Sequence, residues 1–223
     1  MNGLACQLSL AATCAAMLAL GSCRSAYYGA LEKLGVHKRD ILVERVEEGR
    51  DAQHAAKEQF QSALEAFREV SDFEGGELDD LYRRLQKEYD RSEAQVRAVR
   101  SRIEKIEEVS EDLFDEWKQE LQEIQNEELR RRDEISLRET RARYEDLIDA
   151  MRRAESKMQP VLTVFADHVL FLKHNLNARA IASLQGQLGS IEDDISSLIA
   201  DMEGSIAEAD AFIATMEGAG PRP

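Results

Sequence analysis

The stretch LVERVEEGRDAQHAAKEQFQSALEAFREV, residues 42–70, decides the fold of this chain. Within it, apolar and small residues recur at alternating steps of four and three: Leu42, Val46, Gly49, Gln53, Ala56, Phe60, Ala63, Phe67 and Val70. Such steps keep a stripe of residues on one face of an α-helix, as in a seam between packed helices. The small residues let a neighbouring helix approach closely. We therefore predict a helix from His37 to about Ser71.

The same rhythm resumes after a short break. Asp72-Phe73-Glu74-Gly75-Gly76 predicts a turn, because paired glycines disfavour a helix. A second seam begins near Glu77 and follows Leu78, Leu81, Leu85, Glu88, Ser92, Val96, Val99, Ile103, Ile106, Ser110, Leu113, Trp117, Leu121 and Ile124. Two such seams predict an all-α fold, in which a long antiparallel helical hairpin or coiled coil forms an elongated bundle over residues 37–217.

The second seam loses its register between Gln125 and Ser136. It resumes in a new phase, at Leu137, Tyr144, Ile148, Met151 and Met158. This pattern leaves open whether residues 77–158 form one rod or two helices. Pro160 predicts the start of a further helix, because proline is tolerated in a first turn.

The last third of the chain is also periodic. Residues 161–174, VLTVFADHVLFLKH, are the most apolar stretch after the first 22 residues and predict a buried central helix. Asn175-Leu176-Asn177 predicts a kink in it. Apolar residues then recur at helical spacing as far as Met216, and residues 218–223 predict a frayed tail.

The composition is acidic and highly charged. The 223 residues carry a formal net charge of -15, with 33% charged and 6% aromatic side chains. Many charges with few aromatic residues are typical of long helices or coiled coils. Because an acidic surface repels phosphate backbones, we expect no nucleic-acid partner.

The N-terminus predicts export. Residues 1–22 contain no charged side chain, and Leu8 to Leu20 form an apolar run as long as the core of a signal peptide. Leu20-Gly21-Ser22-Cys23 follows and resembles the lipobox of bacterial lipoproteins, which implies that Cys23 becomes the lipid-bearing first residue. Residues 23–36 would then be a membrane-proximal tether. Ordinary cleavage near Ala19 or Ser22 and an uncleaved anchor are the alternatives.

The cysteines agree with this reading. Cys6 and Cys14 lie inside the apolar segment, and no cysteine follows Cys23. A protein made for an oxidising compartment without disulfides has this pattern. By the same resemblance, Arg24 after the lipidated cysteine points to the outer membrane, with the protein facing the periplasm.

Three segments together resemble a known family. They are YYGALEKLGVHKRDILVERV at 27–46, DLFDEW at 112–117 and MQPVLTVFADHVLFLKHNLNARAIASL at 158–184. The chain is similar to an uncharacterised family of bacterial coiled-coil lipoproteins, known only as a domain of unknown function. The resemblance covers nearly the whole mature chain and implies localisation and helical architecture, but no activity.

No motif for catalysis, phosphate binding or metal binding occurs, so we expect no enzyme, cofactor or metal. One polar group stands out in the apolar segment: Asp167, His168, His174, Asn175 and Asn177. Asp167 with His174, and His168 with Asn175, are seven residues apart and share a helix face. The group is either a hydrogen-bond network that fixes helix register or a site for a small ligand or metal.

These observations predict a non-catalytic lipoprotein of the cell envelope that acts as a structural or protein-interaction module. Its partners would be the membrane, through the lipid anchor, and an envelope protein that the sequence does not name; the seams can also support a homo-oligomer. Two features can serve an interface or be ordinary helix: the run Arg130-Arg131-Arg132 and the single tryptophan, Trp117. The alternative function is a ligand- or metal-binding module at residues 167–177.

Overall fold

The computed structural model describes residues 37–72, 78–175 and 178–218. Every element in these ranges is an α-helix: α2 (Lys38–Ser71), α3 (Leu78–Glu123), α4 (Glu127–His174), α5 (Ala178–Gln185) and α6 (Leu188–Gly218). The all-α prediction is confirmed. The chain divides into two units, Met1–Ile41 and Leu42–Pro223. In the first unit, the described part is the start of α2, where the backbone N–H groups of Asp40 and Ile41 donate to the His37 carbonyl.

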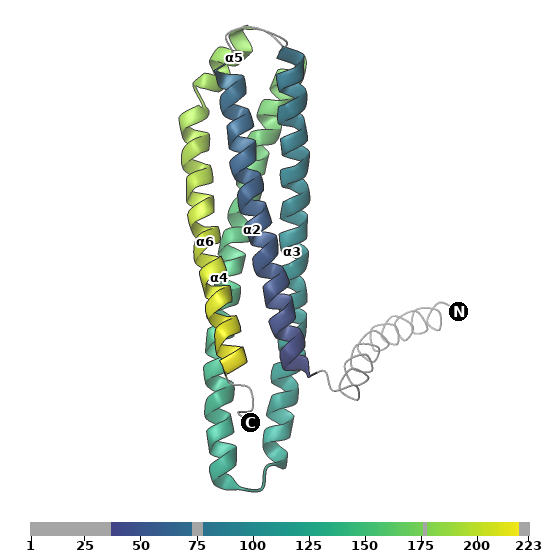
Figure 1. The fold of residues 1–223 in the computed structure, drawn as a ribbon, viewed down its shortest axis with the longest axis vertical. Helices are drawn as coiled ribbons and strands as arrows, with labels where there is room; N and C mark the ends of the chain where they lie inside the picture. Colours follow the sequence, from purple (N-terminus) through teal and green to yellow (C-terminus); the bar gives the residue numbers. More distant parts are fainter. Residues whose placement is uncertain (1–36, 73–77, 176–177, 219–223) are drawn as a thin grey trace, which may run out of the picture. The chain divides into compact units, whose positions relative to one another are not determined.

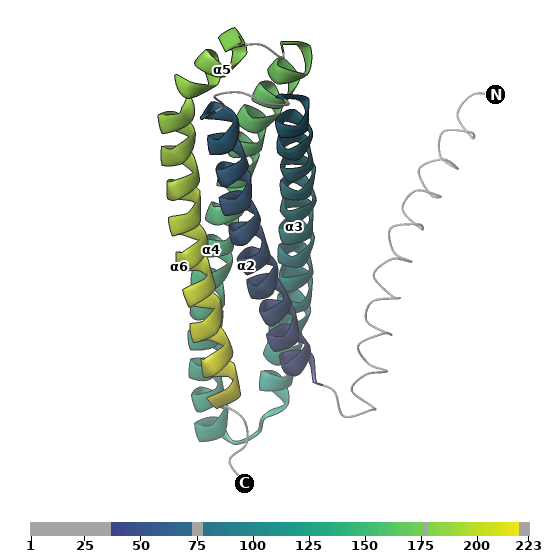
Figure 2. The same cartoon turned by 45° about the horizontal axis from the view of Figure 1, so that its top comes forward.

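The second unit is an elongated helical bundle. Its long helices α2, α3, α4 and α6 lie side by side, and each runs antiparallel to the one before it (Figure 1 and Figure 2). Ion pairs join neighbouring helices around the bundle: Glu69–Arg84 between α2 and α3, Arg100–Glu155 between α3 and α4, Lys157–Asp201 between α4 and α6, and Arg50–Asp210 between α6 and α2. The arrangement is therefore an up-down four-helix bundle closed by its last helix.

The seams predicted from the sequence form the core. All nine seam residues of α2 are buried, and so is every predicted seam residue of α3 from Leu85 to Leu113. Helices approach closely at Gly49, where an added Cβ would lie 2.7 Å from Ile106 Cδ1 and 3.3 Å from Met151 Cε. Near the other end of α2, the rings of Phe67 and Phe165 meet edge to face at 5.8 Å.

The break between α3 and α4 answers the question that the sequence left open. Residues 124–126 are not helical, so residues 78–158 form parts of two antiparallel helices rather than one rod. The side chain of Asn126 caps α4, accepting hydrogen bonds from the backbone N–H groups of Glu128 and Leu129 at 3.0 and 3.1 Å. An asparagine in this position satisfies N–H groups that have no partner within the helix.

The prediction for Pro160 was wrong, since it lies inside α4 instead of opening a new helix. Its side chain is exposed, whereas Met158, Val161 and Leu162 keep the buried face continuous around it. On a solvent-facing side, the carbonyl that loses its hydrogen-bond donor can be hydrated. Packing on both sides of Pro160 thus holds one helix together.

Other predictions in α4 hold in part. Leu147 takes the fully buried place that we predicted for Ile148, which is half-buried. The segment 161–174 is helical but not buried all round, because Leu170 and Phe171 are exposed. The helix ends at His174 with Asn175 as its cap. A second interruption, at Gly186 and Gln187 between α5 and α6, was not predicted; Gln185 Nε2 there donates to the Ser71 carbonyl at 2.6 Å.

Several predicted features lie outside the described residues: the signal peptide 1–22, the tether 23–36, most of the turn at 72–76, and the tail beyond Gly218. Among the helices that are described, none combines the length and apolar character needed to cross a bilayer.

Two helices of the bundle reach further than the others. The helices α3 and α4 have 46 and 48 residues, against 34 in α2 and 31 in α6. Gly49 lies at the level of Ile106 and Met151, so Leu42, two turns earlier, lies near the level of Leu113 and Tyr144. The end of α6 lies near Arg143. Within this unit, residues 113–140 therefore form a two-helix projection, which we call the hairpin extension (Figure 1).

Candidate functional site

The polar group predicted at 167–177 is not assembled into one site. His168 is half-buried and packs edge to face on Phe67, with ring centroids 5.2 Å apart. Burial lowers the pKa of His168, because it disfavours the charged imidazolium, and the nearby Asp167 carboxylate opposes this shift. His168 is therefore part of the packing between α2 and α4.

The other members of this group are dispersed. Asp167 and His174 are exposed, and Asn175 uses its side-chain amide to donate to the Phe171 carbonyl at 3.0 Å. Asn177 lies outside the described residues, as does Cys23. In the described part of the chain, no group of three or more His, Cys, Asp or Glu side chains is placed to hold a metal ion.

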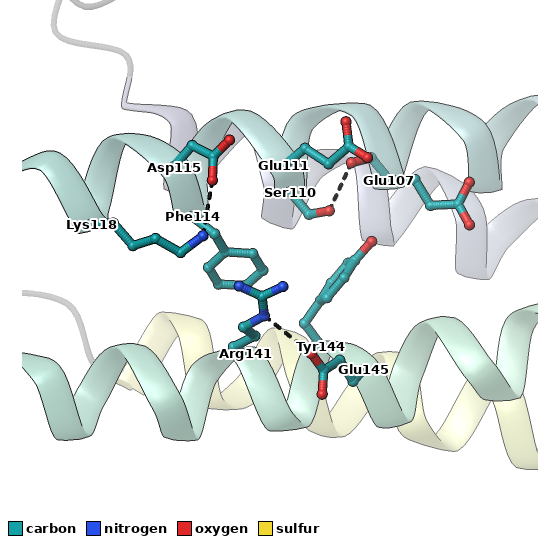
Figure 3. Close-up of a pocket in the computed structure, with 9 residues that line it drawn as sticks. All are labelled: Glu107, Ser110, Glu111, Phe114, Asp115, Lys118, Arg141, Tyr144 and Glu145. Atoms are coloured by element: carbon teal, nitrogen blue, oxygen red, sulfur yellow. Dashed lines mark hydrogen bonds and ion pairs between the residues drawn. The ribbon is translucent and has the colours of Figure 1, made fainter.

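The structure instead shows a groove where the hairpin extension begins (Figure 3). It has a volume of about 480 Å³ and lies between α3 and α4. Its walls are Glu107, Ser110, Glu111, Phe114, Asp115 and Lys118 from α3, and Arg141, Tyr144 and Glu145 from α4. Antiparallel pairing brings these two sets together across a separation of about thirty residues in sequence.

The floor of the groove is aromatic. Phe114 is buried and Tyr144 is half-buried, and their rings meet edge to face at 5.4 Å. Burial raises the pKa of the Tyr144 phenol, and a hydrogen bond with Ser110 acts in the opposite direction. Tyr144 is therefore neutral at physiological pH and offers both an apolar ring and a hydroxyl.

The rim of the groove is charged. The Arg141 guanidinium lies 5.8 Å from the centre of the Phe114 ring and pairs with Glu145 at 3.1 Å (Figure 3). Lys118 pairs with Asp115 at 3.0 Å. Four carboxylates against two cations leave the groove residues with a formal charge of -2. An aromatic floor with a charged rim suits recognition of another side-chain surface, where the floor is desolvated and the rim directs the partner.

The end of the hairpin extension has its own apolar cluster. Buried Phe114, Leu121 and Leu137 pack with partly buried Trp117, Ile124 and Tyr144. Trp117 therefore packs as a seam residue, and its indole Nε1 also donates to Asp133 at 3.0 Å. Beyond the cluster, Leu129 and Ile135 are exposed on either side of the arginine run. Arg131 and Arg132 both pair with Glu128, at 3.1 and 3.0 Å.

Sequence reasoning missed the groove. The useful signal was the loss of register at 125–136, with Tyr144 on the seam that follows it and Phe114 next to the seam residue Leu113 before it. Pairing them requires the register between α3 and α4, and a single sequence does not specify that register.

Comparison with models of protein families gives a match over most of the chain. The model of the family described as "Protein of unknown function (DUF2959)" matches residues 27–216. No curated protein matches the chain, and neither does any solved structure.

Proposed function

The chain belongs to the DUF2959 family of unknown function; from this premise and its fold, we propose that it is a non-catalytic structural or interaction module of the bacterial cell envelope. In this proposal, lipid on Cys23 anchors it in the outer membrane, facing the periplasm. The partner that its bundle binds is another envelope protein or a second copy of the chain.

The hairpin extension carries this proposal. It projects beyond the ends of α2 and α6, so neither of these two helices covers its outer surfaces. A two-helix projection contributes little to closing the four-helix core. The aromatic floor and charged rim of its groove instead suit a contact surface, in which an aromatic residue with nearby arginine is the usual anchor.

The chemistry of the groove supports binding rather than catalysis. Glu145 and Asp115 are each held in an ion pair, as is Glu107, which pairs with Arg152 at 2.5 Å. A general base needs a carboxylate that is free to approach a substrate proton, and a carboxylate held by arginine or lysine is already occupied as an acceptor.

The anchor is tested by radiolabelled palmitate in growing cells. We expect label in the wild-type protein and none in Cys23→Ala, because the thiol and the amine of this residue are the acylation sites in a lipoprotein. Wild-type protein without label would exclude the anchor.

The interaction surface is tested by photo-cross-linking in intact cells. A photoreactive phenylalanine analogue replaces Asp115 on the rim of the groove, and the control places it at Gln61, which is exposed on α2. We expect a discrete adduct from position 115 and none from position 61. Equal adducts from both, or none from either, would count against a specific partner at the groove.

A further inference from the structure

The chain enters the bundle at the same end as the hairpin loop. Leu42, the first residue of the second unit, lies two turns before Gly49 and near the level of Leu113. From there, α3 continues to Glu123, ten residues further or about 15 Å, before the loop at 124–126 turns back into α4. The loop is therefore the outermost point of this end (Figure 1).

The lipid anchor proposed above reaches this end first. Cys23 and Leu42 are 19 residues apart: residues 23–37 span at most about 50 Å even if fully extended, and the helical residues 38–41 add about 6 Å. The hairpin loop lies only about 15 Å beyond the attachment level. The opposite end of α4, at His174, is 30 residues and about 45 Å away from Tyr144. The opposite end can therefore reach the lipid only when most of the chain between Cys23 and Leu42 is extended, whereas the loop needs only about 15 Å of that span, so a weak contact forms more readily at the loop.

The surface at the loop suits a lipid interface. Among described residues, the exposed large hydrophobic side chains are Leu129, Ile135, Leu170 and Phe171. Two of the four lie in the first turns of α4, beside Arg130-Arg131-Arg132. Residues 124–135 carry three arginines against Glu127, Glu128, Asp133 and Glu134, a formal charge of -1, so attraction to anionic lipid is not the main force. Exposed aliphatic residues with adjacent arginines match an interfacial contact, in which the guanidinium groups stay among the headgroups.

We infer that the tip of the hairpin extension, residues 126–135, rests on the lipid surface that holds the anchor, with Leu129 at the boundary between headgroups and acyl chains. The inference rests on the proposed function, since it requires the lipid on Cys23. It sets the orientation of the bundle: the loop faces the membrane, and the end that carries α5 faces away. The groove at Phe114 and Tyr144 then lies close above the lipid surface.

The sequence offers a sharp test, because no cysteine follows Cys23 and the thiol of Cys23 is acylated in the processed lipoprotein. Leu129→Cys and the control Leu170→Cys each introduce one free thiol at nearly equal exposure, 55% and 56%, at opposite ends of α4. Each full-length variant is labelled with an environment-sensitive fluorophore and reconstituted into phosphatidylethanolamine and phosphatidylglycerol vesicles, with and without brominated acyl chains.

We expect bromine to quench the fluorophore at position 129 and to leave position 170 unchanged. Quenching at 170 alone, or at neither position, overturns the inference. If a photoreactive group at 129 forms an adduct to protein, the partner of this surface is a protein instead. Palmitate labelling of the same preparations distinguishes failure of the lipid anchor from failure of the membrane contact at residue 129. Absence of palmitate overturns the anchor, and the inference with it, whereas palmitate without quenching at 129 overturns only the inference.

Discussion

At the scale of single residues, Gln53 carries a buried side-chain amide without a hydrogen-bond partner in the described part of the chain. It lies on the seam of α2, is fully buried, and neither Nε2 nor Oε1 has a hydrogen-bond partner among the described groups. A buried amide without partners costs about 1–3 kcal/mol. Polar residues in helical seams often fix register at a cost in stability, and Gln53 fits that role.

We expect Gln53→Leu to raise the free energy of unfolding by about 1 kcal/mol or more, because leucine removes the unpaired amide and keeps a similar volume. Urea denaturation followed by circular dichroism measures the change. Gln61→Leu, at an exposed position of the same helix, is the control and should have little effect. A lower midpoint for Gln53→Leu would show that the amide is hydrogen-bonded in solution.

His168 makes stability depend on pH. Its pKa is lowered in the folded protein, whereas an unfolded histidine titrates near 6.5. Below about pH 6.5, the unfolded chain therefore binds the proton more readily than the folded chain does, and stability falls as the pH falls. Well above that pH, His168 is neutral in both states, and the loss of stability due to its protonation disappears.

We expect the melting temperature to drop between pH 7.5 and pH 5.5, and the drop to be smaller in His168→Phe, which keeps a ring against Phe67. Differential scanning calorimetry at matched ionic strength measures it. His54→Phe, an exposed histidine on α2, controls for the loss of an imidazole elsewhere. An identical drop in wild type and His168→Phe would refute the assignment.

At the scale of helices, glycines show why α2 can approach its neighbours. A side chain at Gly49 would meet Ile106 and Met151, whereas a side chain at Gly204 on α6 would meet nothing within 4 Å. Glycine costs roughly 0.5–1 kcal/mol in a helix relative to alanine, so of these two residues only Gly49 has a packing reason to remain glycine. The same substitution should therefore have opposite effects at the two sites.

We expect Gly49→Leu to destabilise the bundle by about 1–3 kcal/mol through overpacking, and Gly204→Leu to stabilise it by up to about 1 kcal/mol. Chemical denaturation of both variants under the same conditions provides the comparison. Gly49→Leu with wild-type stability would mean that α2 has room for a side chain at this position.

At the scale of the whole unit, the hairpin extension should be its least protected part. Two helices bury less of each backbone than four, and local opening is easiest where few apolar contacts hold a segment. We expect amides of residues 113–140 to exchange faster in deuterium than those of 92–106 and 150–165, as measured by mass spectrometry of the chain in detergent. Equal protection would show that another surface covers the extension.

Much of this unit follows from the sequence, and the remainder has identifiable reasons. Helical steps in residues 42–70 and 85–113 marked the core correctly, since a continuous apolar stripe can be buried only against another helix. The prediction for Pro160 was wrong because packing against α3 and α6 decides which side of α4 faces solvent. The sequence alone does not show that Pro160 lies on that side. The groove stayed hidden because Phe114 and Tyr144 meet through the pairing of two helices, and local periodicity does not encode that pairing.

The order in which the helices are synthesised determines when each apolar stripe can be covered. Arg50 on α2 finds its partner Asp210 on α6 only after 160 further residues have been made, whereas α3 and α4 are joined by a three-residue loop. The central hairpin can therefore form early, while the apolar stripe of α2 waits for the last helix. A chain that stops before α6 would leave apolar surface on two helices exposed to chaperones and proteases, so the last helix decides whether a newly made molecule survives.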